Sequence, residues 1–387
     1  DRRAAGLCRE LAAHPTGRRV RELTGLALDP TFSAPKLAWL FARDPDLHAR
    51  AAGGELAFGD VACWLAWHLG GGRHVTEPSN ACRTLLVDLT TLTWDAALLD
   101  LFGVPAALLP EIRRSDDLDV RAGGHPAGVD APVAAVLGDQ PAALYGQGCT
   151  SPGMAALTLG TGAFLWSNVG PERPRPPQGV LATAAWHTDR FGPTYALEAF
   201  GANAGNALAI LRSLGLIPKG WASAAPDWSR PHPVVVPAPA GLGTPRWDGA
   251  DRITVLGASG TTSPEQLASA CLAGVAHQIA DALEAMEAQA RPTGPLRVGG
   301  GLAADTALLQ TVADLSGRSL EVAADLEATT RGIAALAATA VGLPGPEGPA
   351  EAAGRTIAPR LDGAGRARER ERWHEAVDVH LATADGG

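Results

Sequence analysis

Apolar residues recur along the chain in two patterns, and their order predicts strands that alternate with helices. The first pattern is a short apolar run typical of a buried strand, and such runs lie at 155–159, 234–236, 253–256, 296–298 and 320–322. The second is a longer stretch with helical spacing, found at 264–290, 306–315 and 330–341. Residues 1–68 also carry helical patterns, joined by a loop. Strands that alternate with amphipathic helices indicate α/β layers.

Two further strands are predicted before residue 147, each followed by a helix. Residues 84–89 alternate between apolar and polar positions, and a leucine-rich helix closed by Gly103 follows them. Residues 133–137 form an apolar run that ends in Gly138-Asp139-Gln140, and Pro141 then stands where a helix would begin. The second strand is the stronger prediction, because its apolar run is uninterrupted.

The length of the chain favours two domains. Its 387 residues exceed what one hydrophobic core usually serves, and 46% hydrophobic with 19% charged residues is an ordinary globular composition. We place the boundary after Gln147, giving domains at 1–147 and 148–387. With this boundary, the turns at 138–140 and 160–162 face each other across a cleft.

Charge and cysteine content favour a cytoplasmic protein that acts on small molecules. A formal net charge of -9 argues against binding to nucleic acid or to an anionic membrane, since both attract basic surfaces. We find no apolar run long enough for membrane insertion and no signal peptide. Five scattered cysteines without a C-x-x-C pair suit reduced, buried thiols better than disulfides or a zinc site.

Asp139 is the first candidate for chemistry. It follows a predicted buried strand, and open α/β sheets bind their ligands at the carboxyl ends of such strands. Asp is also among the best N-cap residues, so Asp139 could instead cap the helix that begins near Pro141. The local pattern alone leaves both interpretations open.

Two glycine-rich turns are the next candidates. Gly160-Thr161-Gly162 follows a predicted strand, and glycine lets the backbone approach a phosphate while Thr161 adds a hydroxyl. By itself this tripeptide favours a simple tight turn over a phosphate loop. Gly299-Gly300-Gly301 also follows a strand and offers a surface without side chains on which a nucleotide could lie. Together with the turn at 138–140, these turns make three that follow predicted strands, and three such turns point to a site. The isolated histidines are assigned no role.

Several of these segments resemble the FGGY carbohydrate kinases, and within that family the glycerol kinase branch, essentially from end to end. The segment at 138–147, GDQPAALYGQ, is the most specific match to that branch. The other segments that carry the resemblance are 33–39, 84–95, 160–164, 241–248 and 299–305.

The resemblance implies an α/β, actin-like fold of the ribonuclease H type, in which two domains close on ATP and substrate. Asp139 is then the base that accepts the proton of the attacking hydroxyl, and the polyol pocket contains Gln140 and Phe164, with Thr31 at the position of a substrate-contacting tyrosine. The phosphates and the nucleotide are assigned to Gly160, Thr161, Gly162, Gly205, Gly300, Gly301 and Asp305. ATP and Mg²⁺ are the implied cofactors, with the metal ligands left unassigned.

Departures from the family pattern bear on the substrate. The family's opening Asp-x-Gly-Thr phosphate hairpin and its Arg-Glu glycerol pair do not occur in this sequence, so we expect an incomplete first domain. Five positions also differ from the usual residue, namely Thr31, Pro141, Arg246, Gly299 and Asp305. The leading hypothesis is ATP-dependent phosphorylation of glycerol to sn-glycerol 3-phosphate. A kinase for another polyol or a ketose, an inactive nucleotide-binding fragment, and a homo-oligomeric state all stay open.

Overall fold

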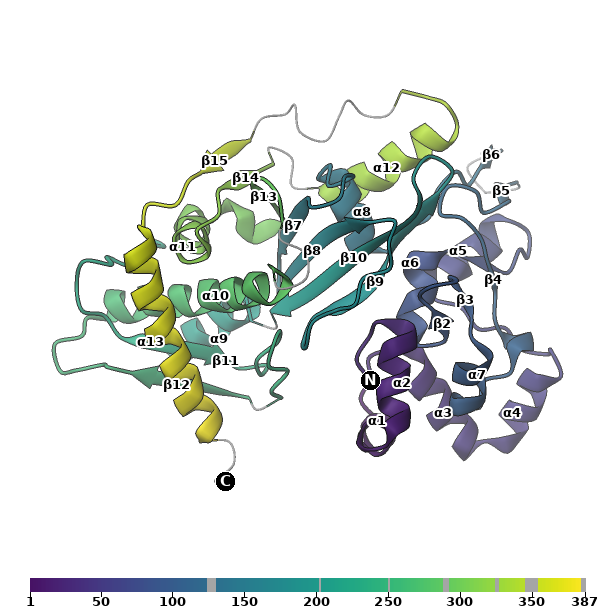
Figure 1. Cartoon of the computed structure of the whole chain (residues 1–387), viewed down its shortest axis with the longest axis horizontal. Coiled ribbons are helices and arrows are strands. Elements are labelled where there is room, and N and C mark those ends of the chain that lie inside the picture. Colours follow the sequence, from purple (N-terminus) through teal and green to yellow (C-terminus); the bar gives the residue numbers. More distant parts are fainter. Residues whose placement is uncertain are drawn as a thin grey trace.

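The N-terminal region of the computed structural model is helical (Figure 1). The structure describes residues 1–123, 130–201, 203–249, 251–287, 292–323, 327–344 and 354–383. Its first five helices are α1 (Ala5–Ala13), α2 (Pro15–Thr24), α3 (Ser33–Arg43), α4 (Pro45–Ala52) and α5 (Val61–Leu69), as predicted for 1–68. Asp44 and Asp60 cap α4 and α5 by accepting backbone N–H bonds, and these bonds fix where both helices begin.

Short strand pairs and small helices follow these five helices. They are β1 (Val75–Thr76) with β4 (Glu111–Ile112), β2 (Val87–Asp88) with β3 (Thr93–Trp94), β5 (Arg121–Ala122) with β6 (Ala131–Pro132), α6 (Pro78–Ala81), η1 (Cys82–Thr84), α7 (Ala96–Phe102) and η2 (Ala106–Leu108). Of the strand predicted at 84–89, only Val87–Asp88 forms, because Leu85 has φ 66° and breaks the extended run. The helix before Gly103 is confirmed as α7.

The strand predicted at 133–137 is wrong. These residues are extended but form no ladder, since only Ala131–Pro132 pairs, with β5. Two isolated backbone bonds hold the segment, from Val133 N–H to the Val120 carbonyl and from Val136 N–H to the Ser115 carbonyl, both 2.9 Å long. The apolar run is explained by packing instead, because Val133 and Val136 lie against a small cluster that contains Val120.

One seven-stranded mixed sheet dominates the rest of the chain (Figure 1). Its order is β15 (Arg355–Ile357), β14 (Leu320–Val322), β13 (Leu296–Gly299), β7 (Ala155–Leu159), β8 (Ala163–Gly170), β10 (Gly192–Gly201) and β9 (Leu181–Thr188). β14, β13 and β7 are parallel, and every other pairing is antiparallel. The sequence predicted β7, β13 and β14 but missed the hairpin strands β8, β9 and β10. The α/β fold class is confirmed.

Helices cover both faces of this sheet. The elements are α8 (Asp139–Gly146), α9 (Gly205–Ser213), α10 (Pro264–Glu287), η3 (Gly301–Ala304), α11 (Thr306–Ser316), α12 (Ala328–Ala340), α13 (Gly363–Ala382) and the pair β11 (Val234–Ala238) with β12 (Arg252–Leu256). Strand side chains alternate between faces, so Leu157 packs with α10 and α11 while Ala156 packs with α8. The predicted helices and the strands at 234–236 and 253–256 are confirmed, but 288–290 lie outside the described residues.

Candidate active site

Two glycine-rich turns and the first turn of α9 meet at the carboxyl ends of β7 and β13. Residues 160–162 are the hairpin turn between β7 and β8, closed by a 2.9 Å bond from Gly160 N–H to the Gly162 carbonyl. β13 runs parallel to β7 with Gly299 beside Thr158, so the turn at 299–301 adjoins this hairpin. The start of α9 joins them, because Gly205 N–H donates to the Gly160 carbonyl at 3.0 Å. We call these two turns and the first turn of α9, which begins at Gly205, the three-turn site.

Two glycines of the three-turn site cannot carry a side chain without moving the backbone. A Cβ at Gly205 would lie 2.8 Å from the Gly160 carbonyl oxygen. Gly300 has φ 90°, and a Cβ there would lie 2.4 Å from the Leu159 carbonyl oxygen. Thr161 and Gly301 are exposed at the same place. The result is a backbone surface with an accessible hydroxyl, as phosphate binding requires.

Asp305 lies beyond the 299–301 turn and is the N-cap of α11. Its Oδ1 accepts hydrogen bonds from the Ala307 and Leu308 N–H groups, each 3.0 Å long. The carboxylate therefore satisfies two of the unpaired N–H groups at the start of the helix. One of its oxygens is thus committed to fixing the end of the turn.

Asp139 is the first residue of α8, and its side chain is exposed. Gly138, and not Asp139, occupies the N-cap position of α8, so the interpretation of Asp139 as the N-cap residue is wrong. Among the described residues, the Asp139 carboxylate accepts one bond, from the Gln140 N–H to Oδ1 at 2.8 Å, and Oδ2 accepts none. Its other neighbour is Thr329 of α12, whose hydroxyl reaches the Asp139 carbonyl at 3.5 Å.

Close packing of α8 against α12 and the sheet sets the position of Asp139. A Cβ at Gly146 would lie 1.9 Å from the Ala328 carbonyl oxygen, and one at Gly332 would lie 1.8 Å from the Ala142 carbonyl oxygen. These two glycines let the helix backbones touch. α8 also packs on β7 and β8, where Phe164 is half-buried and its ring centre lies 4.9 Å from that of Phe200, with the two rings tilted by 38°.

Thr31 is held by contacts within its own turn. It is exposed in the turn before α3, where its N–H donates to Asp29 Oδ1 at 2.8 Å and its carbonyl accepts from Lys36. Within the described ranges, no hydrogen bond joins Thr31 to Asp139 or to the three-turn site. The hydrogen bond from Gly205 thus joins α9 to the 160–162 turn, whereas the hydrogen bonds of Thr31 among the described residues stay within its own segment.

Sequence reasoning missed an ion pair that joins the helical region to the sheet. Arg83 of η1 reaches Glu198 of β10 at 2.6 Å, and its guanidinium also lies 5.2 Å from the centre of the Phe32 ring. Glu198 is 5% exposed. The signal was a lone acid within an apolar strand, which is rare unless the charge is paired.

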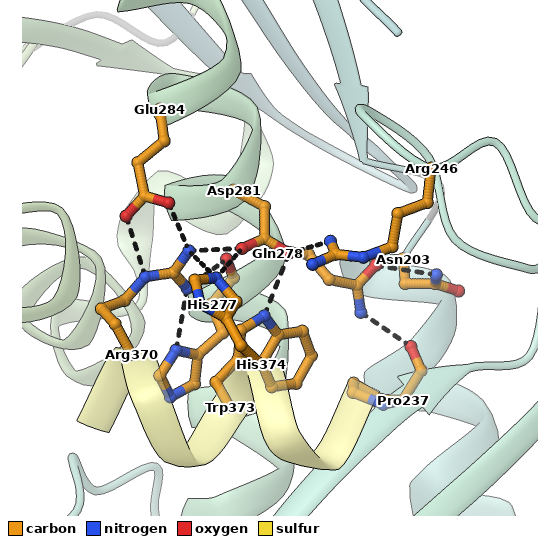
Figure 2. Close-up of polar contacts among 10 residues, drawn as sticks. All are labelled: Asn203, Pro237, Arg246, His277, Gln278, Asp281, Glu284, Arg370, Trp373 and His374. Carbon is orange, nitrogen blue, oxygen red and sulfur yellow. Dashed lines mark hydrogen bonds and ion pairs between the residues drawn. The ribbon is translucent and has the colours of Figure 1, made fainter. Parts of the chain in front are cut away.

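A second polar network anchors the loop at 241–248 and the start of α9 on α10 (Figure 2). Asn203 Nδ2 donates to the Gly241 carbonyl at 2.5 Å and to Gln278 Oε1 at 3.0 Å. From the same loop, Arg246 reaches Asp281 of α10 at 2.5 Å. The backbone that carries Gly205 is therefore tied to a buried helix rather than left as a free loop.

Asp281 is the centre of this network, and its carboxylate is almost wholly buried. Burial raises its pKa, but hydrogen bonds from His374 and Trp373 and the charges of Arg370 and Arg246 outweigh burial and lower that pKa below its usual range. Asp281, Glu284 and His374 could together hold a metal ion by distance alone. The two arginines already occupy the Asp281 oxygens, so we interpret the group as an ion-pair cluster.

Comparisons with known proteins extend over most of the chain. Residues 1–146 match the N-terminal domain, and residues 155–341 the C-terminal domain, of the FGGY family of carbohydrate kinases. Glycerol kinase from Alkalilimnicola ehrlichii is 44% identical over 97% of this chain and 77% of that protein. A crystal structure of Plasmodium falciparum glycerol kinase with ADP is 27% identical, with a TM-score of 0.89 over 98% of this chain and 78% of that chain.

The fold is shared more widely than the sequence. Xylulose kinase from Lactobacillus acidophilus is only 19% identical, yet its TM-score is 0.81 over 99% of this chain and 79% of that chain. None of the helices in the described ranges has both the length and the hydropathy that a membrane crossing requires.

Proposed function

Because this chain belongs to the FGGY family of carbohydrate kinases, we propose that it transfers a phosphoryl group from ATP to a primary hydroxyl of glycerol, giving sn-glycerol 3-phosphate. The observation that carries the proposal is the 44% identity to a glycerol kinase over 97% of the chain. Relatives from Citrifermentans bemidjiense and Myxococcus xanthus carry the same name at 44% and 40% identity.

The three-turn site fits the phosphates of a nucleotide. Gly205 and Gly300 leave room that a Cβ would fill, and the exposed Thr161 hydroxyl adds a donor at the same surface. Mg-ATP, when bound there, supplies the phosphoryl group and the metal's positive charge. We assign Gly160, Thr161 and Gly162 to the phosphates, and the remaining contacts with the nucleotide to Gly205, Gly300, Gly301 and Asp305. For Asp305, the free oxygen is Oδ2, since Oδ1 caps α11.

Asp139 is the proposed general base. The glycerol hydroxyl forms the new O–P bond, its proton passes to Asp139 Oδ2, and the bond between the transferred phosphorus and the ADP oxygen breaks. Oδ2 is suited to this role because the side chain is exposed and only Oδ1 accepts the Gln140 N–H. Phosphoryl transfer depends mostly on alignment and charge stabilisation, so a single carboxylate is sufficient as the base.

Gln140 and Phe164 are the proposed walls of the polyol pocket, with Thr31 as a further wall. Both Gln140 and Phe164 are half-buried, one on α8 and one on β8, which pack together. Thr31 is smaller than the tyrosine that the family usually has at this position, so a pocket that is looser on this side follows from the proposal. A loosened pocket should retain glycerol as the preferred substrate while admitting longer polyols.

Substrate choice is tested in a protein in which the family's Asp-x-Gly-Thr hairpin and Arg-Glu pair precede this chain, by measuring ADP release from ATP with a panel of glycerol, xylulose, ribulose and gluconate. We expect the highest kcat/KM with glycerol. A higher value with xylulose, ribulose or gluconate would refute the proposed substrate. ADP binding in calorimetry without turnover of any member of the panel would instead favour a nucleotide-binding module.

The role of Asp139 is tested in the same extended protein by Asp139→Asn, which keeps the shape of the side chain and removes the base. Loss of a general base costs about 10²- to 10⁴-fold in rate, so kcat should fall by that factor while ADP affinity changes little. Asp95→Asn is the matched control, because Asp95 caps α7 through the Leu98 N–H and Asn caps almost equally well. An Asp139→Asn protein with a kcat within a few-fold of the parent would leave only a structural role for Asp139.

A further inference from the structure

Glu77 is a buried carboxylate, and all of its hydrogen-bond donors among the described residues are neutral. It lies between β1 and α6 and is 0% exposed. Oε1 accepts from the Asn80 N–H at 2.8 Å, from Asn80 Nδ2 at 2.9 Å and from the Ser79 hydroxyl at 2.5 Å. Oε2 accepts from the Ser79 N–H at 3.0 Å and from the Ser115 hydroxyl at 2.7 Å. Burial raises the pKa of Glu77 above its usual range, and hydrogen bonds from Ser79, Ser115 and the Asn80 N–H oppose that rise without cancelling it.

The Ser79 hydroxyl connects this carboxylate to the residue before Asp139. A serine hydroxyl has one hydrogen to donate, and Ser79 donates it to Glu77. Its lone pairs are then directed away from the carboxylate, and one of them accepts the Gly138 N–H at 2.9 Å. Gly138 is the N-cap of α8, so the chain of contacts runs from Glu77 through Ser79 to the residue that precedes Asp139.

Ser115 connects the same carboxylate to the large sheet. Its hydroxyl donates to Glu77 and accepts the His187 N–H of β9 at 3.1 Å. Its backbone N–H donates to the His187 carbonyl at 2.8 Å, and its carbonyl accepts the Val136 N–H at 2.9 Å. Glu77 thereby links α6, β9 and the segment that leads into α8.

The segment before α8 needs this anchor because no strand ladder holds it. Residues 133–137 form only isolated backbone bonds, and the contact from Thr329 to the Asp139 carbonyl is long, at 3.5 Å. The bond from Gly138 to Ser79 is therefore the side-chain contact that most directly fixes the first turn of α8. Displacing a reacting group by about 1 Å can cost about 10²-fold in rate.

We propose that Glu77 is a positioning residue for the phosphoryl transfer, because its carboxylate orients the Ser79 hydroxyl and thereby fixes Gly138 and the direction of Asp139. The inference rests on the proposed function, in which Asp139 is the general base. Glu77 and Ser79 are both buried, at 0% and 2% exposed, so in this proposal both act on the reaction through Asp139.

A double-mutant cycle with Ser79→Ala and Asp139→Asn tests the proposal. Ser79→Ala leaves Glu77 with four donors, so the protein should remain folded, which a thermal melt checks. Its kcat should fall about 10- to 100-fold with the KM for ATP little changed. In the Asp139→Asn background the same change should cost nothing further, because the base that it positions is already gone. Ser167→Ala, a buried serine without a hydrogen-bond partner among the described residues, should match the parent.

A second pair of variants separates the hydroxyl from the shape of the side chain. Threonine and valine have nearly the same shape, but only threonine has a hydroxyl that can donate to Glu77 and accept from Gly138. The kcat of Ser79→Thr should therefore exceed that of Ser79→Val by about tenfold or more. Equal kcat values for Ser79→Thr and Ser79→Val would overturn this inference and leave the proposed function standing. The same would follow if Ser79→Ala lowered kcat by the same factor in the parent and in Asp139→Asn. An unchanged kcat in Asp139→Asn would overturn the proposed function and this inference together.

Discussion

Replacing Asp281 by asparagine should destabilise the C-terminal part of the chain strongly, even though the side chain keeps its shape. The Asp281 carboxylate is 4% exposed and pairs with Arg370, with Arg246 at 2.5 Å, with the Trp373 N–H at 3.0 Å and with His374 at 3.4 Å (Figure 2). Asparagine removes the negative charge and turns an NH₂ group toward these donors. Two arginines then lose their buried counter-ion.

The size of the effect follows from burial. Removing one partner of a buried ion pair costs about 3 to 5 kcal/mol. Unfolding entropy of about 2.1 cal/mol/K per residue gives about 0.8 kcal/mol/K for a chain of this length, so Tm should fall by about 4 to 6 °C. If the C-terminal part melts by itself, its smaller entropy makes the fall larger.

Glu284→Gln provides the matched control. Glu284 pairs with the same Arg370 at 2.9 Å, but its side chain is 52% exposed, and exposed pairs contribute only about 0 to 1 kcal/mol. We therefore expect Glu284→Gln to change Tm by about 1 °C or less. Differential scanning calorimetry of both variants measures this. A Tm for Asp281→Asn within about 1 °C of the parent would refute the reasoning, since it would mean that the buried charge contributes nothing.

The pH dependence provides a second measurement on the same variant. The pKa of Asp281 lies below its ordinary value of 3.8, so its stabilisation is fully present above that value and is lost as pH falls toward the folded pKa. The gap in Tm between the parent and Asp281→Asn should therefore be constant near neutral pH and should narrow below about pH 4. A gap that widens in acid would contradict this sign.

Two further predictions concern the turn at 299–301. Gly300→Ala should weaken ADP binding about tenfold or more in calorimetry, because φ is 90° and the new Cβ would lie 2.4 Å from the Leu159 carbonyl oxygen. Gly294→Ala, with positive φ and open space, should bind ADP like the parent. Gly299→Ser should raise Tm by about 1 to 2 °C over Gly299→Ala, because its hydroxyl reaches the buried Gln147 amide, which has no partner among the described residues. Equal Tm values for Ser and Ala would contradict this.

The parallel part of the sheet could be predicted from the sequence because its strands are buried on both faces. Residues 155–159 and 320–322 are short apolar runs bounded by turn residues, and both form strands with the predicted bounds. The long helix α10 was equally predictable, since its apolar positions repeat with helical spacing over many turns.

The antiparallel strands β8, β9 and β10 could not be read in the same way. Their sequences mix small, aromatic and polar residues, and Glu198 and Asn168 are buried within them. What stabilises these strands is pairing with neighbours, such as Arg83 opposite Glu198, which no local pattern reveals. Residues 133–137 show the opposite error, because an apolar run can pack against a cluster without ever joining a ladder.

Asp139 shows why a residue can be found in a sequence while its geometry cannot. The motif at 138–147 is local, and it identifies the carboxylate and the start of a helix within two residues of the observed bounds. The direction of that carboxylate depends on Ser79, 59 positions away from Gly138, and the packing of α8 depends on Gly332 in a different helix. Each of these contacts needs a small or polar residue at one point only, which leaves no periodic signal. A test of this site must therefore include the distant contacts as well as the carboxylate, because a change at Ser79 is expected to act on the reaction through Asp139.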